Sequence, residues 1–480
     1  MSRACVLAID NGSQSTKVHI FDADGRVLAS AQQPLRPCEF PEPGHVVHPG
    51  DDLWESIAAA ARAAIAAYDG SADDIVAVGL CTIRFCRALL AADGRLIEPV
   101  LSWMDVRVPR PHVDVPEVAF VTTSSGYITH RLTGEFRDTA ANYQGMWPID
   151  QLTARWSLDP AAFAATGMPR HKLFDLVDPG ELLGRVTSEA AAATGLRAGT
   201  AIYATANDKA VEALGAGIDE HTVHLSLGTY TAAMTVGTSP TTDSRSYWVN
   251  FASVPGGYLY ESNGIRRGMW TVSWVRDLLV PPEAVLPSGV RAEQYLEAEA
   301  VRVAPGSGGL IAVLDWLAPT DAPYRRGAFL GFDGTQSRPH LYRAVLEGIA
   351  LTMADHIEAM ESALGRRFDS VVVTGGGAKS DLTMQIVADA LGRPSRRTEV
   401  DDSAGLGSAI CAAVGVGLHP DFESARMAMV RPGRVFHPTP EGIAAYRPIR
   451  ARYARVREHT DPLFHVLSAA GSAEARPAER

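Results

Sequence analysis

Residues 6–21 read VLAIDNGSQSTKVHIF, and this stretch decides the fold. A short apolar run ends in Asp10, glycine and hydroxyl residues follow, and a second apolar run begins after Lys17. The pattern predicts a β-hairpin with a polar turn that is opened by glycine. Such a turn can aim backbone N–H groups, hydroxyls and an ammonium at a phosphate. Its acid can hold Mg²⁺, which takes few carboxylates and keeps several waters. Taken alone, the segment also fits an ordinary hairpin with a polar tip.

The same theme returns twice along the chain. Residues 224–234 read HLSLGTYTAAM, which is again a strand, a glycine with hydroxyls, and a strand. Residues 371–381 read VVVTGGGAKSD, where a strand runs into three glycines and Ser380 is a candidate helix N-cap. Three glycine loops that each follow a strand predict a nucleotide held in a cleft between two related halves.

Length and composition bound the class of protein. With 480 residues, 46% hydrophobic and 21% charged, the chain is typical of a soluble globular protein with two sizeable cores. Its net charge of −11 argues against a nucleic-acid partner and against a basic membrane-binding surface. The five cysteines show no zinc or redox spacing, so we expect free thiols and a cytoplasmic location. The sequence predicts neither a signal peptide nor a membrane span.

Strands and helices alternate, which predicts an α/β protein. We expect a β-meander over residues 1–36, strands over 75–80 and 201–205, a hairpin that turns at residues 93–94, and helices over 51–68 and 123–132. An apolar stripe predicts a helix over 341–364 that stops at Gly365. A strand, loop and helix follow over 371–391, and small residues begin another helix at 404–409. The predicted domains are 1–217 and 218–465, with a disordered tail over 466–480.

With these segments in place, the chain resembles the FGGY carbohydrate kinases, and among them the xylulokinase-like members. The most specific segments are DNGS with Lys17, the pair Asn207-Asp208, and the glycine loops at Gly228 and Gly375. The resemblance implies two actin-like (ribonuclease H-like) domains that flank an ATP and sugar cleft. It implies ATP-dependent phosphorylation of a sugar or polyol hydroxyl, with Mg²⁺.

The resemblance also implies residue roles. Asp208 corresponds to the catalytic aspartate, the general base, and Asp10 to the acid associated with Mg²⁺. The implied cofactor-binding residues are Asp10, Gly12, Ser13, Gln14, Ser15, Lys17, Gly228, Thr229, Gly376, Gly377 and Ser380. The implied substrate-binding residues are Arg84, Trp103, Asp105, Asn207 and Asp208.

Alternative interpretations stay open for single residues, and the sequence departs from the family pattern in places. Asp208 also fits a surface turn, Arg84 a structural ion pair, and Trp103 plain core. Between Arg107 and Thr133 only 25 residues intervene, where most family members carry a much longer insert. Phe85 replaces an acidic residue and Tyr230 a small one, and residues 315–317 replace a Gly-Glu-Arg stretch.

We weigh three functions. The first is an ATP-dependent kinase of a small ketose or polyol, such as a pentulose. The second is a catalytically degenerate sugar or nucleotide sensor, which the shortened segment motivates. The third is a chaperone-type or filament-forming ATPase, for which no peptide-binding or polymerising segment is apparent. A homodimer is the default assembly.

Overall fold

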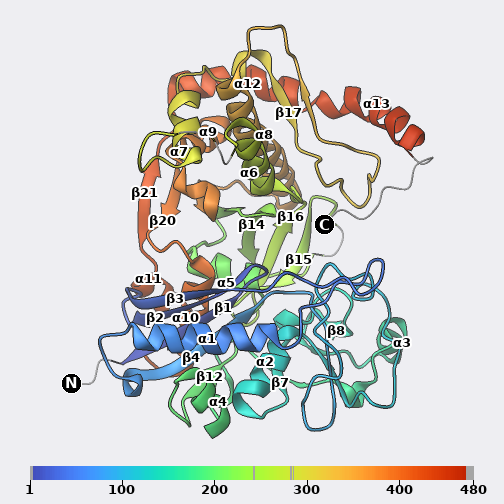
Figure 1. Ribbon diagram of the computed structural model, residues 1–480, viewed down its shortest axis with the longest axis vertical. Helices are drawn as coiled ribbons and strands as arrows, with labels where there is room; N and C mark the ends of the chain where they lie inside the picture. Colours follow the sequence, from blue (N-terminus) through green and yellow to red (C-terminus); the bar gives the residue numbers. More distant parts are fainter. Residues whose placement is uncertain (1–3, 242–243, 282–283, 285, 472–480) are drawn as a thin grey trace.

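The computed structural model describes residues 4–241, 244–281, 284 and 286–471. It shows two lobes, each built on one large β-sheet and covered by helices (Figure 1). Within the described residues, none of the helices combines the length and apolar character that crossing a bilayer requires. All five cysteines are free, as the sequence predicts.

The first sheet has six strands in the order β11-β12-β4-β1-β2-β3. Strands β1, β2 and β3 form an antiparallel meander, and β4 and β12 add in parallel. This confirms the predicted meander. The strands are β1 (Cys5–Asn11), β2 (Ser15–Asp22), β3 (Val27–Pro34), β4 (Ile75–Thr82), β11 (Leu182–Arg185) and β12 (Ala201–Tyr203).

The second sheet repeats this topology in seven strands, in the order β15-β16-β14-β13-β19-β20-β21. Strands β13, β14 and β16 form the meander, β19 and β20 add in parallel, and β21 closes the edge in antiparallel fashion, as β11 does in the first sheet. The chain therefore contains two related halves, as predicted. The strands are β13 (Thr222–Leu227), β14 (Thr231–Gly237), β15 (Tyr247–Phe251), β16 (Tyr258–Ser262), β19 (Ser370–Thr374), β20 (Ser395–Thr398) and β21 (Pro432–Phe436).

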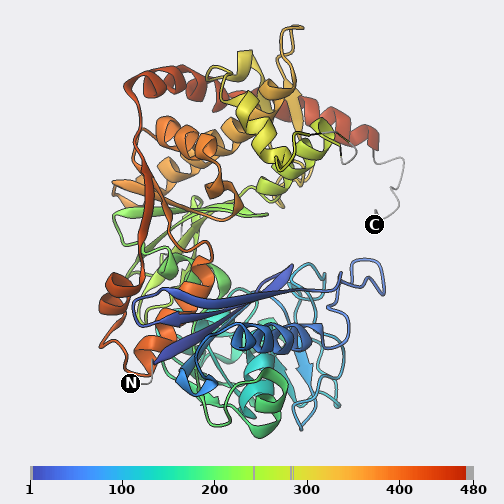
Figure 2. The same cartoon turned by 60° about the vertical axis from the view of Figure 1, so that its left-hand side comes forward.

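Helices cover the faces of both sheets (Figure 2). The helices of the first lobe are α1 (Asp52–Ala66), α2 (Ser124–Thr133), α3 (Pro160–Thr166), α4 (Ser188–Thr194) and α5 (Asp208–Gly215). The second half contributes α6 (Gly268–Leu279), α7 (Ala292–Ala300), α8 (Arg338–Leu364), α9 (Asp381–Leu391), α10 (Ser403–Gly415), α11 (Phe422–Met429), α12 (Pro440–Tyr453) and α13 (Val456–Gly471). The predicted stop at Gly365 is confirmed, because this residue caps α8 in the left-handed conformation. Of the tail predicted to be disordered, residues 466–471 continue helix α13, and residues 472–480 lie outside the described residues.

The remaining strands form short two-stranded sheets. They are β5 (Ala88–Leu90) with β6 (Phe120–Thr122), β7 (Arg137–Thr139) with β10 (Asp175–Val177), β8 (Ile149–Asp150) with β9 (Arg155–Trp156), and β17 (Ile311–Val313) with β18 (Ala328–Leu330). The predicted hairpin at residues 93–94 forms only in part: the turn is present, but the segment after it makes an isolated bridge from Leu96 to Leu90, and β5 pairs with β6 instead.

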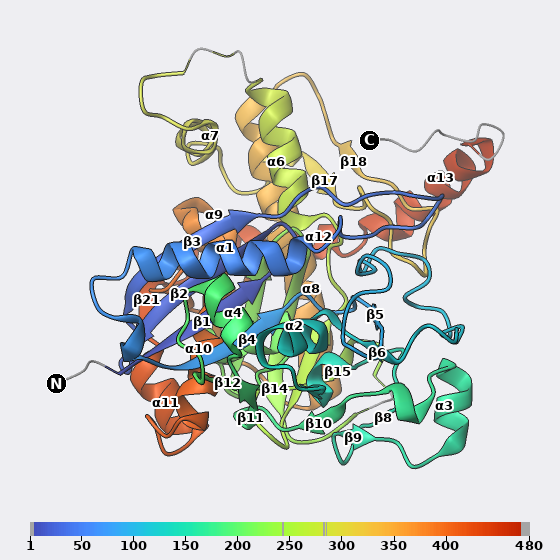
Figure 3. The same ribbon diagram turned by 60° about the horizontal axis from the view of Figure 1, so that its bottom comes forward.

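Helix α10 crosses from the second half back to the first sheet, where it packs on β1 and β4 (Figure 3). Its small residues allow backbone contact: a Cβ atom on Gly407 would lie 1.9 Å from the carbonyl oxygen of Val211 in α5. A Cβ atom on Gly79 in β4 would lie 2.1 Å from the carbonyl oxygen of Ser408. Close packing of this kind requires glycine, so α5 and α10 form a tight layer between the two sheets. This layer carries Asp208 at its start.

Candidate active site

The first glycine loop joins β1 to β2, and the N–H of Gly12 closes it by donating to the carbonyl oxygen of Ser15 at 3.1 Å. Ser13 and Gln14 are exposed at its tip, while Asp10 at the end of β1 is 7% exposed. The ammonium of Lys17 lies 3.3 Å from Asp10 and 3.6 Å from Asp402. Burial and the nearby Asp402 carboxylate raise the pKa of Asp10 to about 7.

Two carboxylates therefore share one ammonium at the first loop. The excess negative charge suits a divalent cation, and a single buried carboxylate with room for waters is how Mg²⁺ is commonly bound. The residues present at this loop fit the cation that the sequence predicts. Asp402, which also accepts a 2.9 Å hydrogen bond from His19, is a member of this cluster that the sequence analysis did not identify.

The second and third glycine loops lie directly against each other. A Cβ atom on Gly375 would approach the carbonyl oxygen of Leu227 to 2.4 Å, so only glycine fits there. By contrast, a Cβ atom on Gly376 would meet nothing within 4 Å, which leaves its backbone open to a ligand. A cleft of about 800 Å³ is lined by Lys17 of the first loop, by Gly375 and Gly376 of the third, and by Asp402. The structure thus brings the three loops together.

Four further predicted residues lie in or next to the second and third loops. Gly228 and Thr229 form the turn between β13 and β14. Gly377 lies in a short 3-10 turn before α9, and Ser380 caps α9 by accepting from the N–H of Thr383 at 3.0 Å. The predicted N-cap role of Ser380 is therefore confirmed.

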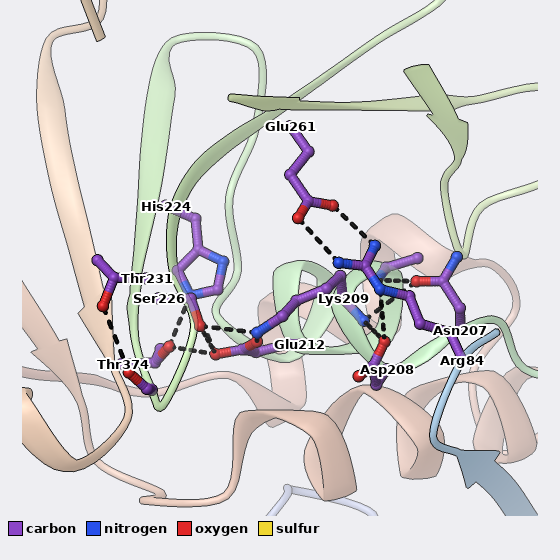
Figure 4. Close-up of polar contacts among 12 residues, drawn as sticks. Arg84, Asn207, Asp208, Lys209, Glu212, His224, Ser226, Thr231, Glu261 and Thr374 are labelled. Atoms are coloured by element: carbon purple, nitrogen blue, oxygen red, sulfur yellow. Dashed lines mark hydrogen bonds and ion pairs between the residues drawn. The ribbon is translucent and has the colours of Figure 1, made fainter. Parts of the chain in front are cut away.

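Asp208 is the first residue of α5, and Asn207 caps the helix by accepting from the N–H groups of Lys209 and Ala210. The amide of Asn207 donates to the carbonyl oxygen of Ala141, which fixes the cap to the first lobe. About 30% of the Asp208 side chain is exposed, and one of its oxygens lies 3.4 Å from Nε of Arg84 (Figure 4). Burial raises the pKa of Asp208, and the cations Arg84 and Lys209 only partly offset this.

Arg84 joins the two lobes. Its two terminal nitrogens donate to the two oxygens of Glu261 at 2.8 and 2.9 Å, and Glu261 in β16 is fully buried. The guanidinium lies 5.1 Å from the centre of the Phe85 ring and 5.0 Å from that of Trp248. The Glu261 and Asp208 carboxylates outweigh the cost of burial and raise the pKa of Arg84. Glu261 was missed from sequence, although a lone acid in the apolar strand YLYES signals a buried polar contact.

A second buried cluster connects α5 to the second sheet (Figure 4). The carboxylate of Glu212 accepts from Lys209 at 2.8 Å, from Ser226 at 2.8 Å and from Thr374 at 2.6 Å. Because Thr374 donates to Glu212, the Nε2 atom of His224, 2.7 Å away, must donate to Thr374. Ser226 and Thr374 stand just before the second and third loops, so this cluster ties the helix of Asp208 to both.

Trp103 and Asp105, the two other predicted substrate-binding residues, differ in exposure. Trp103 is 45% exposed, which excludes the core interpretation for it. Asp105 is 1% exposed, and its two oxygens accept from the side chain and backbone of Arg107 and from the N–H of Val46. Within the described residues, no hydrogen bond or ion pair joins either residue to Asp208.

Tyr230 occupies the space beside Gly264, where a Cβ atom would lie 2.3 Å from the tyrosine ring. Burial and the Glu261 carboxylate raise the pKa of its phenol. The tyrosine that departs from the family pattern thus lies within electrostatic reach of Arg84 and Glu261. Asp315, in a further departing segment, is buried and lies 3.4 Å from Arg457.

Comparison with known proteins supplies the family. The sequence matches the N-terminal domain of the FGGY family of carbohydrate kinases over residues 5–114 and 112–215, and the C-terminal domain over residues 223–416. The chain is 43% identical over 471 residues to the uncharacterized sugar kinase YgcE of Escherichia coli, covering 97% of this chain and 95% of that protein. It is 27% identical to the autoinducer-2 kinase of Klebsiella pneumoniae, covering 94% and 93%.

Solved structures agree on the fold. The xylulose kinase of Rhodospirillum rubrum superposes with a TM-score of 0.81 at 24% identity, covering 96% of this chain and all of that one. The xylulose kinase of Lactobacillus acidophilus gives a TM-score of 0.82 at 20% identity, covering 97% and 100%. The predicted two-domain α/β fold is confirmed. The chain belongs to the FGGY family of carbohydrate kinases and is a phosphotransferase that acts on a sugar hydroxyl.

Proposed function

We propose that this kinase transfers the γ-phosphoryl group of ATP to a hydroxyl of a small ketose or polyol, with Asp208 as the general base. One observation carries the proposal: Asp208 contacts Arg84 on the layer between the lobes, and its helix is tied to the two loops that frame the nucleotide side. A pentulose is the acceptor we favour. Autoinducer-2 is a second candidate, because autoinducer-2 kinases are among the relatives.

The residues divide the chemistry between them. Asp208 takes the proton of the acceptor hydroxyl, the acceptor oxygen forms a bond to the γ-phosphorus, and the bond to the β–γ bridging oxygen breaks so that ADP leaves. Arg84 and Asn207 orient the acceptor and the base, with Trp103 as an apolar wall and Asp105 holding the Trp103 loop through Arg107. Such transfer depends on positioning and charge neutralisation rather than on covalent help.

On the nucleotide side, the proposal assigns three groups of contacts. Gly12, Ser13, Gln14 and Ser15 of the first loop, with Gly228 and Thr229 of the second, offer N–H groups and hydroxyls to the phosphates. Lys17 neutralises phosphate charge, and Gly376, Gly377 and Ser380 face the adenosine. Asp10 would hold Mg²⁺, which supplies further positive charge to the phosphates.

An acceptor panel tests the proposal. We expect ADP release, in a coupled assay with Mg-ATP, with at least one of the pentuloses, hexuloses, tetritols, glycerol or autoinducer-2. If the protein bound ATP and a sugar by calorimetry but released no ADP with any acceptor, the degenerate-sensor alternative would replace this proposal.

A further inference from the structure

Arg84 is the cation nearest to Asp208, yet its charge is already satisfied within the protein. Two of its five N–H groups bond to Glu261 at 2.8 and 2.9 Å, and Nε faces Asp208 at 3.4 Å. Its side chain is 13% exposed, against none for Glu261. Two N–H groups remain for ligand oxygens. They can donate hydrogen bonds to hydroxyls, but the positive charge behind them is shared with two carboxylates.

The charges around Arg84 also disfavour a negatively charged acceptor. Lys209, the next cation, is bonded to Glu212 and Ser226 rather than directed to the acceptor side. Asp208, Glu261 and Glu212 together present three carboxylates to the two cations Arg84 and Lys209. A carboxylate on the acceptor would therefore enter a region of net negative charge, while a neutral polyol would find both donors and an acceptor.

We propose that Glu261 makes the acceptor site selective for neutral sugars and polyols and against sugar acids. By occupying both terminal nitrogens of Arg84, it removes the bidentate fork that would otherwise recognise a carboxylate. The inference rests on the proposed kinase function and adds the charge class of its acceptor. It assigns a specificity role to a residue on β16, in the lobe opposite to Arg84.

Matched acceptor pairs test the inference in the wild-type protein. Each pair is a polyol and the sugar acid of the same carbon number, for example xylitol with xylonate and glucitol with gluconate. We expect every polyol to have a kcat/KM at least 100-fold above that of its acid. Binding is measured in parallel by titration calorimetry, which reads the charge preference even where turnover is absent. An acid that is bound or phosphorylated as well as its polyol would overturn the inference.

Glu261→Gln then tests the residue itself. The amide keeps the shape of the side chain but leaves Asp208 as the one remaining carboxylate paired with Arg84 in the part of the chain that the structure describes, so the polyol-to-acid ratio should fall at least tenfold through improved use of the acid. Glu361→Gln is the matched control, because Glu361 is also buried and bidentate to an arginine, Arg393, outside the site. The ratio should stay unchanged in the control. An unchanged ratio in Glu261→Gln would assign the selectivity elsewhere and refute the role of Glu261.

These results separate this inference from the proposed function. Absence of ADP with every acceptor, together with neutral-selective binding, would refute the kinase proposal and leave the charge preference standing. ADP formation with sugar acids at the same rate as with polyols would refute the charge preference and leave the kinase proposal standing.

Discussion

Glu261 and Glu212 are two glutamates close to Asp208, and they are satisfied in different ways. Glu261 is fully buried and accepts from both terminal nitrogens of one arginine, Arg84, whose Nε faces Asp208. Glu212, whose side chain is 14% exposed, accepts from Lys209, Ser226 and Thr374, which come from α5, β13 and β19. The first glutamate binds the arginine that we propose contacts the acceptor, whereas the second joins three elements.

The comparison teaches that burial alone does not assign a role to a carboxylate. Burial by itself would raise the pKa of Glu212, but Lys209, His224 and the hydroxyl donors lower it below its usual range. A carboxylate with this many donors stays ionised and serves as a structural anchor. We therefore expect changes at Glu212 to act on stability and on both glycine loops, and changes at Glu261 to act on the acceptor.

Replacing Asp208, whose pKa both glutamates influence, should have the largest effect. Asp208→Asn keeps the shape of the side chain and removes the base, so kcat should fall by about 10²–10⁴-fold. The thermal midpoint should change little, because the amide still fits the N-terminus of α5. Steady-state kinetics and thermal unfolding measure the two. If Asp208→Asn kept the wild-type kcat, Asp208 would not be the general base. There would then be no reason to compare Glu261 with Glu212 as groups that serve it.

Truncating Glu212 should mainly lower stability. Glu212→Ala leaves the Lys209 ammonium in a largely buried site without its carboxylate, which costs about 3–5 kcal/mol in the free energy of unfolding. The double variant Lys209→Met/Glu212→Leu removes both charges and should recover much of that loss. Urea unfolding measures both variants. If the double variant were as unstable as Glu212→Ala, the hydroxyl contacts rather than the ion pair would hold the three elements together.

A third buried carboxylate, Asp10, extends the comparison with Glu261 and Glu212, and a pH series tests it. Asp10 has a pKa of about 7 in the folded chain against 3.8 for the free side chain. The folded state therefore binds more protons between these values, and stability falls as the pH rises from 4 to 7. Without Mg²⁺, the wild type should lose up to about 1.4 kcal/mol per pH unit more than Asp10→Asn. Parallel slopes in urea unfolding for the two proteins would show that Asp10 is already ionised at pH 5.

The fold was largely predictable from local pattern. The two hairpins at residues 6–21 and 224–234, the stop at Gly365 and the N-cap Ser380 all follow from residue types whose physical role is local. The start of α10 was also visible, because small residues predict close approach, and Gly407 does lie against Val211.

The site was less predictable, because its key contacts join residues far apart in the chain. Arg84 meets Glu261 at a separation of 177 residues, and Thr374 meets Glu212 at 162. No local pattern pairs such residues. The family resemblance supplied Asp208 and Arg84, but it offered no reason to mark Glu261, Glu212 or Asp402, whose roles depend on how the two sheets face the α5–α10 layer.

The smallest expected effect separates the ring contacts of Arg84 from its ion pairs. Phe85 has a left-handed backbone, with φ of 61°, which costs a residue other than glycine about 1–2 kcal/mol. Phe85→Gly relieves this strain but loses the ring near Arg84, worth about 0.5–1 kcal/mol, so the KM for the acceptor should rise about two- to fivefold. The control Phe85→Leu keeps the strain and also loses the aromatic ring, so it should be less stable than Phe85→Gly in urea unfolding. If the leucine variant were the more stable one, packing of the side chain rather than backbone strain would dominate at this position.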